Sequence, residues 1–265
     1  MEAVARRTMS VLMSIAANLA AIHERIARAA KKVGRNPDDV ALMAVTKTQP
    51  AERIVEAYEA GQRLFGENRV QEFAEKFVAL EKLRGADEPA SPTRPAVGNV
   101  GLQFHMIGHL QSNKAAKAAE IFHAVDSVDS AKLAERLNAA AEKLGKTLDV
   151  LIEINIGGEG AKSGIAPESA GLEGILSGAP EWKSLRIRGL MTVPPFSEDP
   201  GGARPYFRRL RELRDRLAAR QLPAVGLDQL SMGMSHDFEV AIEEGSTCVR
   251  IGTAIFGERR GRVAL

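Results

Sequence analysis

One lysine stands at the end of an apolar run that has the composition of a buried strand. Residues 42–45 are apolar, Lys47 lies two positions after them, and Pro50 ends the run and begins a helix. Burying an ammonium group is costly unless a partner or a lowered pKa offsets the lost hydration. Lys47 is therefore either a rim residue whose amine reaches solvent or an amine held for Schiff-base chemistry. Its residue type alone favours the first interpretation, a rim residue whose amine reaches solvent.

Two C-terminal segments, 230–235 and 250–257, have the composition of a phosphate site. Gly233 and Gly252 would let backbone N–H groups approach an anion. Hydroxyl groups that could donate to the same anion come from Ser231, Ser235 and Thr253. Each segment alone is typical of a turn with capping serines. Together, at the ends of the last two strands of a barrel, they favour a phosphate site.

An arginine, Arg250, precedes the second of these glycines by two residues. Its guanidinium stays charged and is able to donate a hydrogen bond to a ring nitrogen. A lysine, a phosphate cradle and an arginine are together typical of a pyridoxal 5′-phosphate (PLP) site. Lys47 would form the Schiff base, and Arg250 would face the pyridine nitrogen.

Eight apolar stretches, with helical patterns between them, predict the elements that position these residues. The expected strands cover 42–47, 63–65, 104–107, 123–126, 150–155, 187–191, 227–231 and 248–252. Such alternation implies a parallel sheet with right-handed crossovers. The sequence therefore predicts an α/β fold, a single (β/α)8 TIM barrel preceded by an extra helix over about residues 9–33. An open doubly wound sheet is the alternative.

The expected barrel uses nearly all of the 265 residues, so we expect one domain over 1–265. Residues 84–102 interrupt the alternation, because glycine, proline and serine are frequent there and large apolar residues are few. This composition predicts a surface insertion.

Composition argues against several classes of function. A net charge of +2 without a basic stripe gives no case for nucleic acid, and the apolar run 11–17 is too short to span a membrane. Cys248 is the single cysteine, which excludes an intramolecular disulfide and fits a cytoplasmic protein. We interpret Cys248 as a small buried hydrophobe rather than a nucleophile. The histidines are too scattered in spacing to predict a metal site.

Seven segments occur in this order along the chain: AVTKTQP, LFGENRVQE, FHMIGHLQSNK, HAVDSVDS, INIGGEGAKSGI, RGLMTVPPF and LSMGMSHDFEVAIEEGSTCVRIGTAIFG. On these segments the chain closely resembles the pyridoxal phosphate homeostasis proteins, single-domain relatives of the alanine racemase barrel. The resemblance runs from about Asn18 to Glu258, apart from 84–102. It implies that Lys47 holds PLP. It also implies that the pocket is lined by Asn68, Ser231, Arg250, Gly252 and Thr253.

The resemblance implies a protein of intracellular PLP homeostasis, which stores or delivers the cofactor without robust catalytic turnover. Its partners would be PLP and PLP-dependent apo-enzymes, and we expect a monomer. The permanent cation Arg250 would disfavour protonation of the ring nitrogen, and the chain lacks a second domain that could supply an opposing acid or base. Two alternatives stay open: a PLP-dependent amino acid racemase, and an aldolase that forms a Schiff base on Lys47 without cofactor.

The chain differs from the family pattern at two positions. Gln49 stands where the family often has a second lysine, and His109 stands where it often has proline. The resemblance also offers Lys162 as a secondary amine near the cofactor, although lysines in such positions are usually solvated. Glu67 and Asp126, at strand ends, are candidates for an acid or base and equally for buried hydrogen-bond partners.

Overall fold

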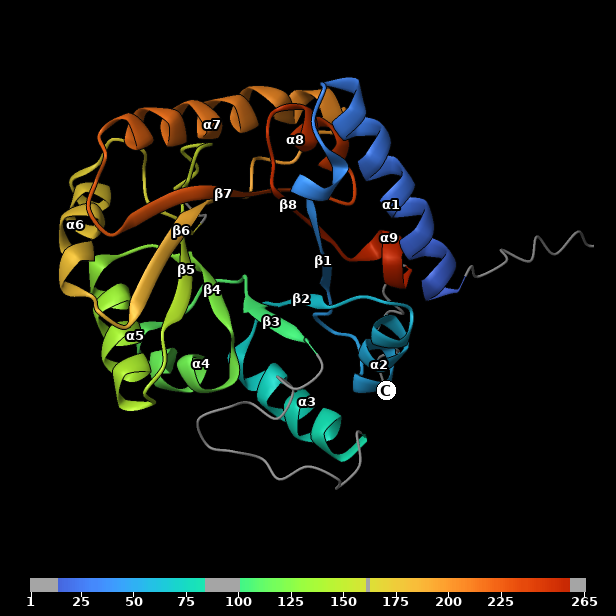
Figure 1. The fold of residues 1–265 in the computed structure, drawn as a ribbon, viewed down its shortest axis with the longest axis horizontal. Helices are drawn as coiled ribbons and strands as arrows, with labels where there is room; N and C mark the ends of the chain where they lie inside the picture. Colours follow the sequence, from blue (N-terminus) through green and yellow to red (C-terminus); the bar gives the residue numbers. More distant parts are fainter. Residues whose placement is uncertain (1–13, 84–100, 161–162, 258–265) are drawn as a thin grey trace, which may run out of the picture.

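A closed barrel of eight parallel strands forms the centre of the protein (Figure 1). The computed structural model describes residues 14–83, 101–160 and 163–257. The strands are β1 Ala41–Val45, β2 Leu64–Glu67, β3 Gln103–Met106, β4 Ala124–Val128, β5 Leu148–Glu153, β6 Leu185–Met191, β7 Val225–Met234 and β8 Cys248–Ile251. Each strand pairs with the next in the chain, and β8 pairs with β1. The predicted TIM barrel is confirmed, and the doubly wound alternative is wrong.

Helices surround the barrel (Figure 1). They are α1 Ile15–Lys32, α2 Ala51–Glu59, α3 Val70–Leu83, α4 Ala115–Ile121, α5 Ala131–Lys143, α6 Ala170–Gly178, α7 Arg204–Ala219, α8 Phe238–Glu243 and α9 Thr253–Phe256. Short 3-10 turns cover Pro37–Asp39, Ser112–Lys114, Ala179–Glu181 and Pro200–Ala203. None of the described helices is long and apolar enough to cross a membrane.

The extra N-terminal helix is present as α1, which lies outside the barrel beside α8 and α9 (Figure 1). The Ser14 side chain caps it by accepting from the Ala17 N–H group at 3.2 Å. Its apolar residues at helical spacing, Ile15, Leu19, Ile22 and Ile26, are all buried. Burial of this stripe explains why the helix remains attached to the barrel.

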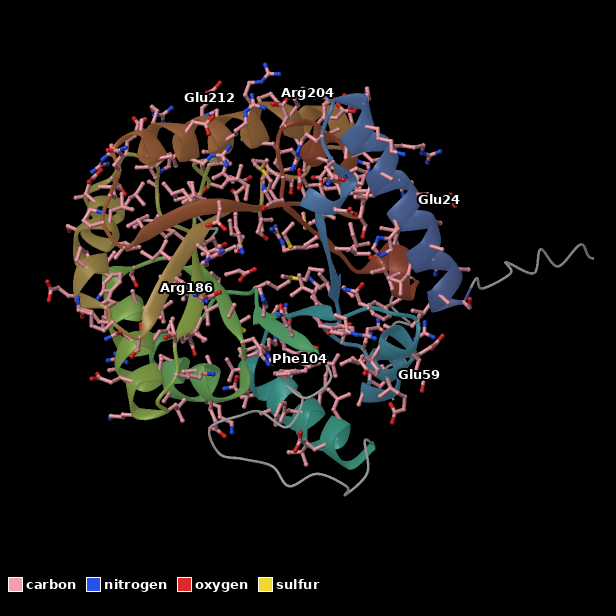
Figure 2. The ribbon with its side chains drawn as sticks, in the orientation of Figure 1. Glu24, Glu59, Phe104, Arg186, Arg204 and Glu212 are labelled. Carbon is pink, nitrogen blue, oxygen red and sulfur yellow. The ribbon has the colours of Figure 1, made fainter. Side chains whose placement is uncertain are left out.

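The side chains on the outer face of the barrel strands belong to a different cluster from those on the inner face. Outside the wall, aromatic rings pack between strands and helices. The ring of Phe104 in β3 (labelled in Figure 2) lies against the ring of Phe73 in α3, with centroids 4.6 Å apart and ring planes tilted by 40°. Inside the wall, Met43 and Val45 are buried but belong to no part of that outer core. Side chains point alternately to the two sides of a strand. The inner sides of β1 to β8 therefore hold a separate set of residues, and several of these are polar.

The strand boundaries differ by a few residues from the sequence-based ones, and two differences affect named residues. Strand β2 continues through Glu67, so this carboxylate belongs to the strand and not to the loop after it. Leu102, the last residue of the expected insertion at 84–102, is buried just before β3. Leu102 packs in the outer core, which a solvated loop residue would not do. Residues 84–100 lie outside the described part of the chain.

Burial of His123 makes the stability of this fold depend on pH. Its Nδ1 atom accepts from the Phe104 N–H group at 3.1 Å, and desolvation by burial lowers the pKa of His123 to about 4. The unfolded chain, with a histidine pKa near its ordinary 6.5, binds the proton more readily. Stability from the neutral ring is therefore present above about pH 6.5 and is lost as the pH falls toward 4.

We expect His123→Asn, which keeps an acceptor near the Nδ1 position but does not titrate, to reduce the fall in unfolding free energy between pH 6.5 and 4. Denaturant unfolding across this pH range measures the effect. The matched control is His23→Asn on the exposed side of α1. An unchanged slope in His123→Asn would show that His123 does not carry this part of the pH dependence.

Candidate functional site

The six residues predicted to line the cofactor pocket all lie at the carboxyl ends of strands. They belong to four strands that are neighbours in the barrel, in the order β7, β8, β1 and β2. Ser231 lies in β7, Arg250 in β8, Gly252 and Thr253 directly after β8, Lys47 after β1, and Asn68 after β2. The fold therefore brings residues from both ends of the sequence to one side of the barrel mouth. Their contact with a cofactor stays a prediction.

Arg250 and Ser231 are in direct contact inside the barrel. One guanidinium nitrogen of Arg250 donates to Ser231 Oγ at 2.8 Å, and another donates to the Thr192 carbonyl oxygen at 2.8 Å. All three residues are buried. Thr192 also donates its hydroxyl to the Ile154 carbonyl at 2.7 Å, so the cation is linked to the end of β5. These bonds fix the direction in which the guanidinium points.

Carboxylates inside the barrel compensate the buried guanidinium charge. Burial lowers the pKa of Arg250, and the charges of Asp126, Glu153 and Asp237 act in the opposite direction. Asp126 Oδ1 lies 3.0 Å from His105 Nδ1, while its Oδ2 is buried without a hydrogen-bond partner among the described residues. Asp126, one of the two candidate acids, is therefore one of the carboxylates that compensate the charge of Arg250 inside the barrel.

Glu153, at the end of β5, is a site residue that the sequence reasoning missed. Ser163 donates to its Oε1 at 2.8 Å, and its Oε2 is buried without a partner in the described part of the chain. Burial raises the pKa of this carboxyl, and the Ser163 hydrogen bond opposes the rise. The sequence signal that could have indicated Glu153 is a charged residue near the end of the apolar run 150–154. The same pattern, a charged residue at the end of an apolar run, indicates Lys47.

The loop between β1 and α2 presents Lys47 as a half-buried side chain. A Cβ atom placed on Gly252 would lie 3.4 Å from the Val45 carbonyl oxygen, so the turn after β8 passes beside the end of β1. Lys47 follows Val45 by two residues. The lysine and the expected phosphate-binding turn are therefore neighbours at the mouth.

Asn68 is held by a close backbone contact. A Cβ atom on Gly108 would lie 2.4 Å from the Asn68 carbonyl oxygen, a distance that no side chain tolerates without moving the backbone. Glycine at 108 therefore allows the loop after β3 to pack on Asn68. His109, the residue after Gly108, lies with Nδ1 3.2 Å from Asp129 Oδ2.

Gly233 has a packing role in this site. Its φ angle is +94°, and a Cβ atom there would lie 2.5 Å from the Cβ of Ala241 in α8. The next N–H group, that of Met234, already donates to Asp237 Oδ1 at 2.6 Å. Gly233 is therefore better explained as a turn glycine than as an anion-binding glycine. The anion-binding expectation thus falls mainly on Gly252 and Thr253.

Two other chemistries receive no support from the described residues. Within the ranges that the structure describes, no three histidine, cysteine or acidic side chains gather as metal ligands. Burial raises the pKa of the Cys248 thiol to about 12, which keeps it protonated and unreactive near neutral pH. Lys162, the suggested secondary amine, lies outside the described residues.

The arrangement has three chemical parts. Lys47 supplies an amine that is able to condense with a carbonyl compound. Arg250 supplies a buried, fixed positive charge that faces the barrel interior. Gly252 and Thr253 supply backbone and hydroxyl donors at the mouth. Such a set fits a phosphorylated aldehyde with a heterocyclic ring.

Comparisons with known proteins identify the family. The profile described as "Alanine racemase, N-terminal domain" matches residues 17–260. The pyridoxal phosphate homeostasis protein of Aquifex aeolicus is 43% identical over 248 residues, which cover 94% of this chain and 100% of the relative. The chain belongs to the pyridoxal phosphate homeostasis protein family. The family member of Escherichia coli K12 is 42% identical, with 92% of this chain and 97% of that one covered.

Solved structures agree with this assignment. PipY of Synechococcus elongatus, whose structure is described as having PLP bound, superposes with a TM-score of 0.73 at 36% identity and covers 92% of this chain and 100% of its own. An alanine racemase of Clostridium difficile shares the fold alone, with a TM-score of 0.63 at 14% identity, and this chain spans 59% of it. The family resemblance inferred from the sequence segments is confirmed.

Proposed function

We propose that this protein binds PLP through Lys47 and serves intracellular PLP homeostasis by storing the cofactor or delivering it to apo-enzymes. The observation that carries the proposal is the position of Lys47. It follows β1 and lies beside the turn at Gly252, and β1 pairs with β8, the strand that contains the buried Arg250. Its homologues are named for PLP homeostasis, and the PipY relative is described with PLP bound. The protein acts as a monomer in the cytoplasm under this proposal.

Each residue of the site has a separate task. When bound, PLP supplies an aldehyde for condensation with an amine and a ring that withdraws electrons. The Lys47 amine holds the cofactor covalently, and Gly252 and Thr253 donate to its phosphate. Arg250 faces the ring nitrogen, with Ser231 holding the guanidinium in place. Asn68 forms the β2 side of the pocket.

The same site explains low turnover. A guanidinium held between Ser231 and the Thr192 carbonyl stays charged, and a fixed positive charge disfavours a proton on a nearby ring nitrogen. The ring is then a weak acceptor of electrons. Neither tyrosine of the chain is placed as an acid or base at a strand end: Tyr58 lies in α2 under the Arg63 guanidinium, and Tyr206 lies in α7.

Substitution of the lysine tests the proposed attachment. We expect Lys47→Ala to abolish the visible Schiff-base absorbance after incubation with PLP and to leave the circular dichroism spectrum unchanged, because a half-buried side chain at the rim contributes little packing. Lys132→Ala, on the exposed side of α5, is the matched control and should keep the chromophore. A Lys47→Ala protein with full absorbance would place the Schiff base on another lysine. A wild type that forms no chromophore would favour the aldolase alternative.

Proton exchange at the α-carbon tests the absence of turnover. We expect the PLP-loaded wild type, incubated with L-alanine in D2O, to exchange the α-proton no faster than free PLP at equal concentration, because the ring nitrogen stays unprotonated. NMR of the amino acid measures the exchange. Exchange or racemisation far above the free-cofactor control would contradict this and support a racemase.

A further inference from the structure

A network of charged side chains holds the turn that carries Lys47 from its outer side. Thr46, directly before the lysine, is fully buried, and its hydroxyl donates to Glu67 Oε1 at 2.8 Å. Its N–H group donates to the Gly66 carbonyl at 3.0 Å. The Thr46 side chain therefore points outward, toward α3, and its backbone is tied to β2. Lys47 follows in a turn that the Gln49 N–H group closes by donating to the Thr46 carbonyl at 2.9 Å.

The residue after the lysine has an unusual backbone conformation. Thr48 has a φ angle of +65°, a region that β-branched residues rarely occupy because it is strained. Its N–H group donates to Glu72 Oε1 at 2.6 Å. This bond, from the first turns of α3, supports the conformation that turns the chain at Lys47.

One ammonium group joins both sides of the turn. Lys76 Nζ, on α3, lies 2.9 Å from Glu67 Oε1 and 2.7 Å from Glu72 Oε1, and it donates to the Thr46 carbonyl at 2.8 Å. Its side chain is only 10% exposed and the Glu67 side chain is fully buried, so solvent screens these contacts weakly. Burial raises the pKa of Glu67, and the charge of Lys76 opposes the rise. Removing Lys76 would leave two acids without their shared cation.

We propose that Lys76 is a positioning residue for Lys47: its ammonium binds Glu67, Glu72 and the Thr46 carbonyl and thereby holds the turn that presents Lys47 at the mouth. The inference rests on the proposed role of Lys47 as the cofactor lysine. Lys76 acts through the backbone of residues 46–48, which it contacts at the Thr46 carbonyl. This also assigns Glu67 to the outer side of the barrel as a buried hydrogen-bond partner and not as an acid or base toward the cofactor.

The rate at which the apo-protein forms its chromophore with added PLP tests the proposal. We expect Lys76→Met, which keeps the apolar stem and removes the charge, to slow chromophore formation by roughly 10- to 100-fold, the scale on which a displacement of about 1 Å acts on a reacting group. Lys76→Arg should restore much of the rate, because it returns a cation to the two carboxylates. Lys117→Met, which removes the exposed pair with Glu120 on α4, is the matched control and should react like the wild type.

The outcomes separate this inference from the proposed function. If Lys47→Ala forms the wild-type chromophore, the attachment itself is wrong. If Lys47→Ala forms no chromophore but Lys76→Met forms it at the wild-type rate, attachment through Lys47 is supported and the positioning role of Lys76 is overturned. If Lys76→Met fails to fold by circular dichroism, Glu72→Ala carries the test, since it removes the acceptor of the Thr48 N–H group and one of the two carboxylates on Lys76 but leaves the buried Lys76–Glu67 pair. Glu72→Ala should then be slowed, and a wild-type rate would overturn the proposal.

Discussion

Closure of the barrel by the pairing of β8 with β1 is the constraint on which the site depends. The register places Met43 opposite Arg250 and Ala44 opposite Ile251, so the first and last strands of the chain share one set of hydrogen bonds. Parallel pairing turns both carboxyl ends to the same face. This register brings the end of β1, which Lys47 follows, and the strand that contains Arg250 to the same side of the barrel. An open sheet would leave them at opposite edges.

A buried guanidinium explains much of the polar interior. A charge removed from water is tolerated only when hydrogen bonds and opposite charges replace its hydration. Here Ser231 Oγ and the Thr192 carbonyl accept hydrogen bonds from the guanidinium, and Asp126 and Glu153 supply negative charge nearby. The buried oxygens of these two acids that have no partner among the described residues mark the interior as a place for further polar groups. The interior is therefore built for a polar ligand rather than as an ordinary apolar barrel core.

Sequence reasoning located the strand ends well, because each follows from a short apolar run and a turn signal. The predicted barrel places Lys47, Ser231 and Arg250 at the ends of adjacent strands, and the pairing of β7, β8 and β1 confirms that adjacency. Sequence reasoning could not decide to which side of the barrel wall a side chain at the end of a strand points. Glu67 was a candidate acid by position, yet it points outward to Lys76, a contact between residues of different elements that no local pattern encodes.

Other features also depend on tertiary packing, so the local sequence could not predict them. Gly233 looked like an anion-binding glycine, but the Cβ of Ala241 in α8 explains why it is glycine. The charged side of α7 gave no sign that Arg204 and Arg211 would reach Glu244, at 3.0 and 3.1 Å. Such long-range partners are selected by the fold and not by neighbouring sequence.

The central claim is that the cofactor is held covalently by Lys47 at the end of β1. Its most direct test is borohydride reduction of the PLP-loaded protein followed by proteolysis and mass spectrometry of the labelled peptide. The account predicts one pyridoxyl group, on the peptide that contains Lys47. A label on any other lysine, or a loaded protein in which reduction fixes no label, would contradict it.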